Sequence, residues 1–167
     1  MLKGEWNENL SYLLNIQINY ELQASYDYYN IHLYFIKDSV GLDKLGSYFK
    51  KMSDEEKTHA DTLVNYLSKR GGIVELYDVT KPSFSIKNNN DILQAFEKSL
   101  EMEEKINKNL LDLHTSAEND PHFTDFLESE FLDEQVEAIY DLKKKLSLIK
   151  RIGNDNYGLW DFVNSLE

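Results

Sequence analysis

The chain has 167 residues, a length that suits one domain spanning residues 1–167 with a sizeable core. Its 18 Lys and Arg against 30 Asp and Glu give a net charge of −12, which disfavours nucleic acids and anionic membranes as partners. The absence of cysteine excludes disulfides, thiolate metal sites and a cysteine nucleophile. No apolar run approaches the roughly 20 residues of a membrane span.

Two prolines and seven glycines are few for this length, so long helices are favoured over a turn-rich β fold. The chain breaks at Gly41, at Arg70-Gly71-Gly72, at the Asn-rich segment 88–91, at Asn119-Asp120-Pro121 and at Gly153–Asn156. These breaks leave a first piece that ends before Gly41, then the pieces 41–69, 91–117 and 121–150, and a short tail. Pro121 is well placed at a first helical position.

Each long piece carries apolar residues at helical spacing. The clearest stripe follows heptad spacing in 41–69 and consists of Leu45, Phe49, Met52, Glu56, His59, Leu63 and Tyr66. The other stripes are Leu14, Ile18, Glu21, Ser25, Tyr28 and His32; Leu93, Phe96, Leu100, Glu103 and Leu110; and Leu132, Gln135, Ile139, Leu142, Leu146 and Ile149. The pattern predicts an all-α fold, a bundle of four long amphipathic helices.

Residues 70–90 show no clear helical period. Such a stretch can run the length of a bundle as one long crossover, which makes the second and third helices parallel. Within it, the apolar segment 73–77 is expected to lie against the outside of the bundle. The amphipathic tail 159–166 predicts a short fifth helix that folds back after the turn at 153–158.

Every stripe contains a polar exception: Glu21, Glu56 with His59, Glu103, and Gln135. Three carboxylates near the middle of one bundle repel one another unless they are protonated or hold cations. Glu56 and His59 are three residues apart and share a helix face. Oxygen ligands with one imidazole suit iron, manganese or zinc. Taken singly, the Glu-x-x-His pair also fits a solvated helix face, and Gln135 fits a core amide.

The predicted metal site is asymmetric, because a symmetric site needs two Glu-x-x-His motifs and this chain has one. The first position, with Glu21, Glu56 and His59, is well supplied with ligands. The second has Glu103 and a bridging Glu56, and is expected to be completed by water. A weak second position suits a centre that releases its product.

Several motifs in register resemble eukaryotic-type ferritins of the ferroxidase-active, non-haem heavy-chain type. Residues 17–26 resemble the first-helix signature of that family, 53–60 the second-helix motif, 70–72 the following turn, and 119–128 with 132–139 the fourth helix. The resemblance runs in order over nearly the whole chain. It implies a ferritin-like bundle with one long crossover.

The resemblance also implies roles for individual residues. Glu21, Glu56 and His59 correspond to the ligands of the tighter iron position. Glu103 corresponds to the ligand of the second position, with Glu56 bridging. Gln135 corresponds to the amide near both irons, and Tyr28 to the tyrosine beside the centre. Glu55 corresponds to a carboxylate that relays iron inward.

A second cluster, His122, Asp125 and Glu128, lies along one side of a helix at i, i+3 and i+6. Such residues also make an ordinary helix N-terminal turn. In ferritins the matching acidic positions line a cation channel on a three-fold axis, with His114 near that junction. The family's mineral-nucleating carboxylates are only partly kept, because Lys57 and Thr58 follow Glu55. The short fifth helix implies a wider or differently lined four-fold pore.

The resemblance thus implies an iron storage and detoxification protein that oxidises Fe(II) with dioxygen at a di-iron centre within each subunit. Fe(III) would be stored as mineral in a hollow shell of twenty-four subunits. Iron is the expected metal and haem is not expected. Residues 1–6 lack the apolar core of a signal peptide, so the expected location is cytoplasmic. The alternatives are a passive shell subunit that co-assembles with an active chain, another di-iron bundle enzyme, a haem-containing bacterioferritin-like protein and a plain helical interaction module.

Overall fold

The computed structural model describes residues 6–87 and 89–167. The expectation that residues 1–6 are not a signal peptide falls mostly on residues 1–5, which lie outside the described chain. No strand occurs in the described ranges, which confirms the all-α prediction. The helices are α1 (Glu8–Ile36), α2 (Asp43–Lys69), α3 (Asp91–Ser116), α4 (Pro121–Leu127), the π-helical η1 (Glu128–Leu132), α5 (Asp133–Ile152) and α6 (Asn156–Asn164). No described helix combines the length and apolar character needed to cross a membrane.

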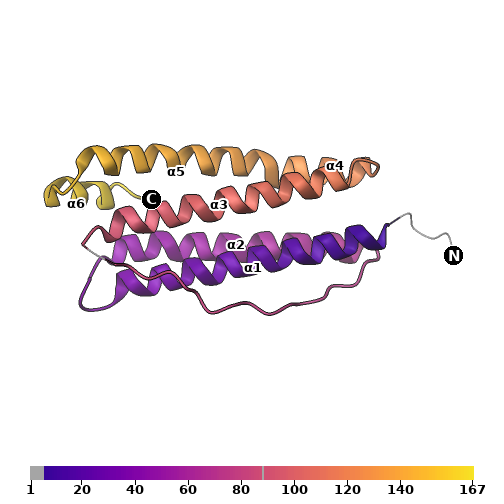
Figure 1. Cartoon of the computed structure of the whole chain (residues 1–167), viewed down its shortest axis with the longest axis horizontal. Coiled ribbons are helices and arrows are strands. Elements are labelled where there is room, and N and C mark those ends of the chain that lie inside the picture. The colour runs from indigo at the N-terminus through magenta and orange to yellow at the C-terminus, as the bar shows by residue number, and fades with distance from the viewer. Residues whose placement is uncertain (1–5, 88) are drawn as a thin grey trace.

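Two antiparallel pairs build the bundle: α1 with α2, and α3 with the continuous α4–η1–α5 helix (Figure 1). The segment between α2 and α3 runs along the bundle from one end to the other, so α2 and α3 point in the same direction (Figure 1). The predicted long crossover is therefore confirmed. The short helix α6 folds back beside α5, as predicted, but it begins at Asn156, within the predicted turn, and ends at Asn164; it buries Phe162 and Val163.

Side-chain amides of α1 hold the crossover against the bundle. Buried Asn15 donates from Nδ2 to the Ile73 carbonyl oxygen at 2.9 Å, and its Oδ1 accepts from the Glu75 amide nitrogen at 2.9 Å. Further along, Gln23 makes the same pair of contacts with the backbone of Thr80 at 3.0 and 2.8 Å. The crossover has no helix ladder of its own here, so these amides supply part of its backbone hydrogen bonding.

The segment 73–77 lies along the bundle, but its attachment differs from the apolar contact expected from the sequence. Ile73 is 77% exposed and Leu76 is 71% exposed, whereas Val74 is partly buried against the core. Backbone hydrogen bonds to Asn15 hold the segment, and most of its apolar side chains point away from the bundle.

The predicted helix 121–150 forms, but it is not regular throughout. Asp120 caps it by accepting from the Phe123 amide nitrogen at 3.0 Å, and Pro121 occupies the first turn, as predicted. The π-helical turn η1 then interrupts the α-helix. Leu127, Phe131 and Gln135 are all buried. In a regular α-helix, a side chain eight residues further along points about 80° away from the first, around the helix axis. The wider π turn compensates for that rotation and keeps all three side chains inward.

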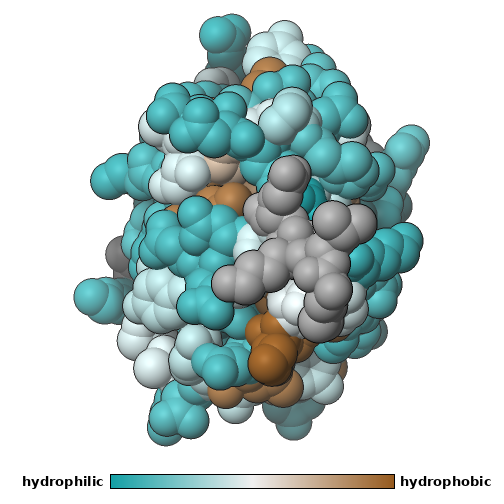
Figure 2. All heavy atoms as spheres, turned by 90° about the vertical axis from the view of Figure 1, so that its right-hand side faces the viewer, coloured by the Kyte–Doolittle hydropathy of each residue, from teal (hydrophilic) through white to brown (hydrophobic). Residues whose placement is uncertain are grey.

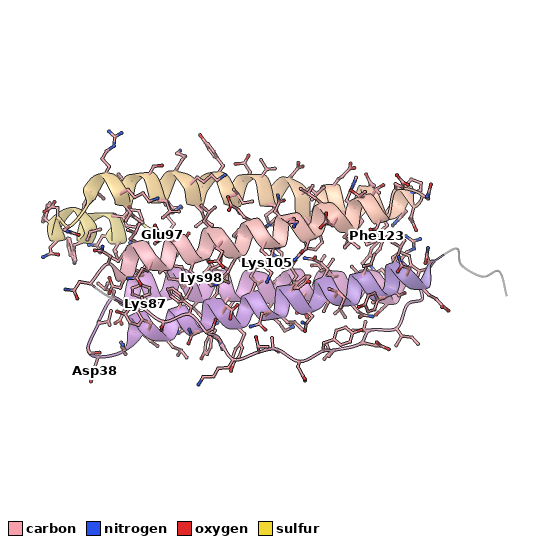
Figure 3. The ribbon with its side chains drawn as sticks, in the orientation of Figure 1. Asp38, Lys87, Glu97, Lys98, Lys105 and Phe123 are labelled. Carbon is pink, nitrogen blue, oxygen red and sulfur yellow. The ribbon has the colours of Figure 1, made fainter. Side chains whose placement is uncertain are left out.

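Aromatic side chains pack at both ends of the core. Phe49 contacts Tyr28, Phe35 and Phe96 at ring-centroid distances of 6.3, 5.7 and 5.4 Å, near the end where α6 docks. At the opposite end, a cluster comprises Trp6, Tyr66, Phe123 (labelled in Figure 3) and Phe126. The outer surface of that end is mainly hydrophilic (Figure 2). The polar exceptions of the four stripes lie between these two apolar ends.

The two amide anchors allow a matched stability test. Asn15→Ala is expected to lower the free energy of unfolding by about 1–3 kcal/mol, because it strands partly buried backbone groups. Gln23→Ala removes solvent-accessible contacts of the same kind and is expected to cost about 0.5 kcal/mol. Denaturant unfolding of both variants checks this. Equal losses would show that burial of the anchor does not decide its contribution.

Candidate metal centre

All four long helices place a polar side chain at the same buried level of the bundle. Glu21 of α1, Glu56 of α2, Glu103 of α3 and Gln135 of α5 are 0%, 3%, 3% and 4% exposed. Each stands on the apolar stripe of its own helix, so the packing that forms the core also carries these groups inward.

Three of the predicted ligands form a compact group. One ligand atom from each of Glu21, Glu56 and His59 lies within 4.8 Å of the others. His59 Nδ1 is 3.1 Å from Glu56 Oε2 and 3.8 Å from Glu21 Oε2. Glu21 Oε2 is buried and accepts from no amide, hydroxyl or other donor group in the described part of the chain, and its carboxyl neighbour is Glu56. A carboxylate oxygen without a donor is costly to bury, and a cation satisfies it.

Glu103 of α3 interacts with Glu56 and is held by two other predicted residues. The buried Tyr28 hydroxyl donates to Glu103 Oε1 at 2.7 Å. Gln135 Nε2 lies 3.3 Å from Glu103 Oε2 and donates to it. Glu103 is not part of the compact three-ligand group. Tyr28 and Gln135 therefore act on the geometry of Glu103, the predicted ligand of the second position.

Burial and repulsion from neighbouring carboxylates raise the pKa values of Glu21 and Glu56. Burial is the main cause of the strongly raised pKa of Glu21, and neighbouring Glu56 adds to it. The pKa of Glu56 is raised by burial and then by Glu103. Burial, followed by the charge of Glu103, raises the pKa of the Tyr28 hydroxyl well above its ordinary value. Glu21 and Glu56 thus favour their protonated forms, and a cation would relieve the same repulsion.

Two residues that the sequence analysis did not single out contact the centre. Buried Gln17 donates from Nε2 to Glu21 Oε1 at 2.9 Å. Its signal was its position one turn before Glu21 on the same helix face. Glu134 Oε1 lies 3.1 Å from His59 Nε2. It is next to Gln135 but off the apolar stripe, so periodicity did not mark it.

Glu55 stands outside the buried centre. Its side chain is exposed and lines an open groove that also involves His59, Glu130 and Glu134. The groove connects the solvent with the His59 side of the centre.

The second predicted cluster does not close into a site within one chain. His122 Nδ1 is 3.0 Å from the Tyr66 hydroxyl, and Glu128 Oε1 is 2.7 Å from His114 Nε2. Asp125 is exposed on α4. These residues do not form a three-ligand group with one another in the described ranges. Their channel role stays a prediction, because a three-fold axis needs further copies of the chain.

The donor set fits a metal ion of intermediate hardness. Two buried carboxylates and one imidazole, with one unpartnered carboxylate oxygen, are ligands that suit iron, manganese or zinc. The chemistry of these residues thus agrees with iron as the bound ion.

Comparison with known proteins gives a consistent result. A family model of ferritin, described as a ferritin-like domain, matches residues 12–152. Ferritin-2, chloroplastic, of Zea mays is 42% identical over 157 residues, covering 92% of this chain and 62% of the maize protein. Ferritin-4, chloroplastic, of Arabidopsis thaliana is 37% identical over 170 residues, covering 99% of this chain and 65% of that protein. Soma ferritin of Lymnaea stagnalis is 42% identical over 152 residues, 90% of this chain and 84% of its own length.

The chain spans less than two thirds of the length of the two chloroplastic relatives. The family match nevertheless covers all of α2, α3, α4, η1 and α5 and most of α1, including every residue of the buried centre. Fold, buried centre and sequence similarity together establish that the chain belongs to the ferritin family.

Proposed function

We propose that this chain is an iron-storage subunit that oxidises Fe(II) to Fe(III) with dioxygen. The observation that carries the proposal is the compact group of buried Glu21, buried Glu56 and half-buried His59, in a chain of this family. A structural role alone gives no reason to bury three carboxylates at one level, because their burial costs free energy.

The first Fe(II) ion would bind to Glu21, Glu56 and His59. The second would bind between Glu56 and Glu103, so that Glu56 bridges the two ions. Tyr28 and Gln135 hold Glu103 in place by hydrogen bonds. Anionic oxygen ligands favour Fe(III) over Fe(II), because the higher charge interacts more strongly with them. Each Fe(II) gives one electron to dioxygen, and the protein supplies geometry and charge.

The proposal includes a shell of twenty-four copies in which Asp125, Glu128 and His122 line the cation channels. A net charge of −12 per chain attracts cations over long range. Glu55 would pass ions along the groove that it shares with His59. The oxidised ion would leave from the Glu103 side, where fewer protein ligands hold it, and mineralise in the cavity.

A passive shell subunit that relies on an active partner chain is the competing function. The cytoplasmic location stays a prediction, because two of the relatives are chloroplastic by name and longer than this chain. Oxidation kinetics of the purified protein distinguish an active subunit from a passive one.

Stopped-flow mixing with dioxygen after anaerobic addition of two Fe(II) per subunit tests the activity. The wild type is expected to show a fast ferric absorbance change that exceeds a protein-free control. Glu21→Ala and His59→Ala are expected to slow it by at least about tenfold, since each removes a ligand of the first position. Glu137→Ala removes an exposed carboxylate of α5 and serves as the control. An unchanged fast phase in both ligand variants would refute the site.

The buried acids also predict a pH dependence of the metal-free protein. The pKa values of Glu21 and Glu56 are raised in the folded state, so above their ordinary pKa of 4.5 the folded chain binds more protons than the unfolded chain. The free energy of unfolding therefore falls as the pH rises from about 4.5 toward the raised pKa values. Glu21→Gln is expected to weaken this fall and to stabilise the metal-free protein at pH 7 by about 1 kcal/mol or more.

Denaturant unfolding in the presence of a chelator, at several pH values, measures the effect. Glu137→Gln removes an exposed charge and is the matched control. An identical pH profile for wild type and Glu21→Gln would show that the acids of the centre do not strain the empty bundle. Adding Zn²⁺ should stabilise the wild type more than Glu21→Gln, because a ligand that binds only the folded state raises stability.

A further inference from the structure

Both ring nitrogens of His59 face carboxylates, but on different sides of the imidazole. Nδ1 points into the bundle, 3.1 Å from Glu56 Oε2. Nε2 points to the rim of the groove, 3.1 Å from Glu134 Oε1. The His59 side chain is 16% exposed and that of Glu134 is 53% exposed. The imidazole therefore joins the buried centre to a carboxylate at the surface.

The chemistry of the two partners differs. A glutamate carboxylate oxygen is a hydrogen-bond acceptor. In the 3.1 Å contact with Glu134 Oε1, His59 Nε2 is therefore the donating nitrogen. In neutral imidazole only one nitrogen carries the proton, so Nδ1 then has the free electron pair that a metal ion needs.

We infer that Glu134 is a positioning residue that holds His59 in the Nε2–H tautomer and so directs Nδ1 toward the metal position. A carboxylate that accepts the distal N–H of a ligating histidine fixes the tautomer and orientation of the ring and increases its basicity. This role rests on the proposed function, because it concerns the same centre.

Nδ1 faces Glu56 and Nε2 faces Glu134, so the two contacts are made by different nitrogens of the ring. A cation bound at Nδ1 would therefore leave the outer hydrogen bond to Glu134 in place.

The π-helical turn contributes a second contact to the same ring. Phe131 lies three residues before Glu134, and its ring meets the imidazole edge-on at a centroid distance of 5.6 Å and an interplanar angle of 66°. Phe131 is 2% exposed, so its own position is fixed by the core. Phe131 thus restricts the rotation of the His59 ring, and Glu134 accepts the hydrogen bond from its Nε2.

Binding of Co²⁺ under anaerobic conditions, followed by calorimetry and by the visible absorption of the ion, tests the role without iron oxidation. Glu134→Ala is expected to weaken binding about 10- to 100-fold and to change the absorption of the bound ion. Glu134→Gln is expected to bind nearly as well as the wild type, because its amide oxygen can still accept the Nε2–H. Glu130→Ala, in the same groove and also exposed, is the matched control for loss of charge.

Wild-type affinity in Glu134→Ala would overturn the inference. So would equal losses in Glu134→Ala, Glu134→Gln and Glu130→Ala, which would show that the groove attracts cations only by its charge. His59→Ala separates the two proposals. If Co²⁺ binding survives that substitution unchanged, the ligand group itself is wrong and the proposed function fails with it.

Discussion

The repulsion among three carboxylates buried at one level is the constraint on which the rest of this structure depends. Glu21, Glu56 and Glu103 come from three helices and are each at most 3% exposed. Such a cluster needs neighbours that bear the cost of desolvation, either by donating hydrogen bonds or by accepting a cation. Gln17, Tyr28 and Gln135 donate to two of the three acids. The remaining deficit lies at the first position, where Glu21 Oε2 has no partner within the described chain.

The apolar ends of the bundle make that deficit tolerable. Aromatic side chains pack on both sides of the polar level, with Phe49 at the centre of one cluster and Tyr66 of the other. Burial of large rings supplies much of the favourable free energy of folding. A polar middle between two well-packed ends lets one bundle combine a stable fold with buried carboxylates that a cation would stabilise.

Much of this arrangement could be predicted from the sequence, because each central residue interrupts an apolar stripe. The heptad seam of α2 marked Glu56 and His59, and the matching register marked Glu103 and Gln135. Glu134 was missed because it lies beside the stripe of its helix, at a half-exposed rim that periodicity cannot distinguish from ordinary surface. The π turn was missed because the apolar stripe assigned to this helix began at Leu132 and so left Leu127 and Phe131 out. The contacts of Asn15 with the crossover depend on a segment almost 60 residues away, which no local pattern encodes.

The crossover divides the bundle into two helical hairpins, and the centre divides in the same place. Glu21, Glu56 and His59 belong to α1 and α2, whereas Glu103, Gln135 and Glu134 belong to α3 and α5. The three-ligand group therefore needs only the closure of the short α1–α2 connection, which costs little chain entropy. The interaction of Glu56 with Glu103 and the contact of Glu134 with His59 need the two hairpins to dock. The group of Glu21, Glu56 and His59 can therefore form once α1 and α2 pair. The complete centre forms only when the α1–α2 hairpin docks on the α3–α5 hairpin.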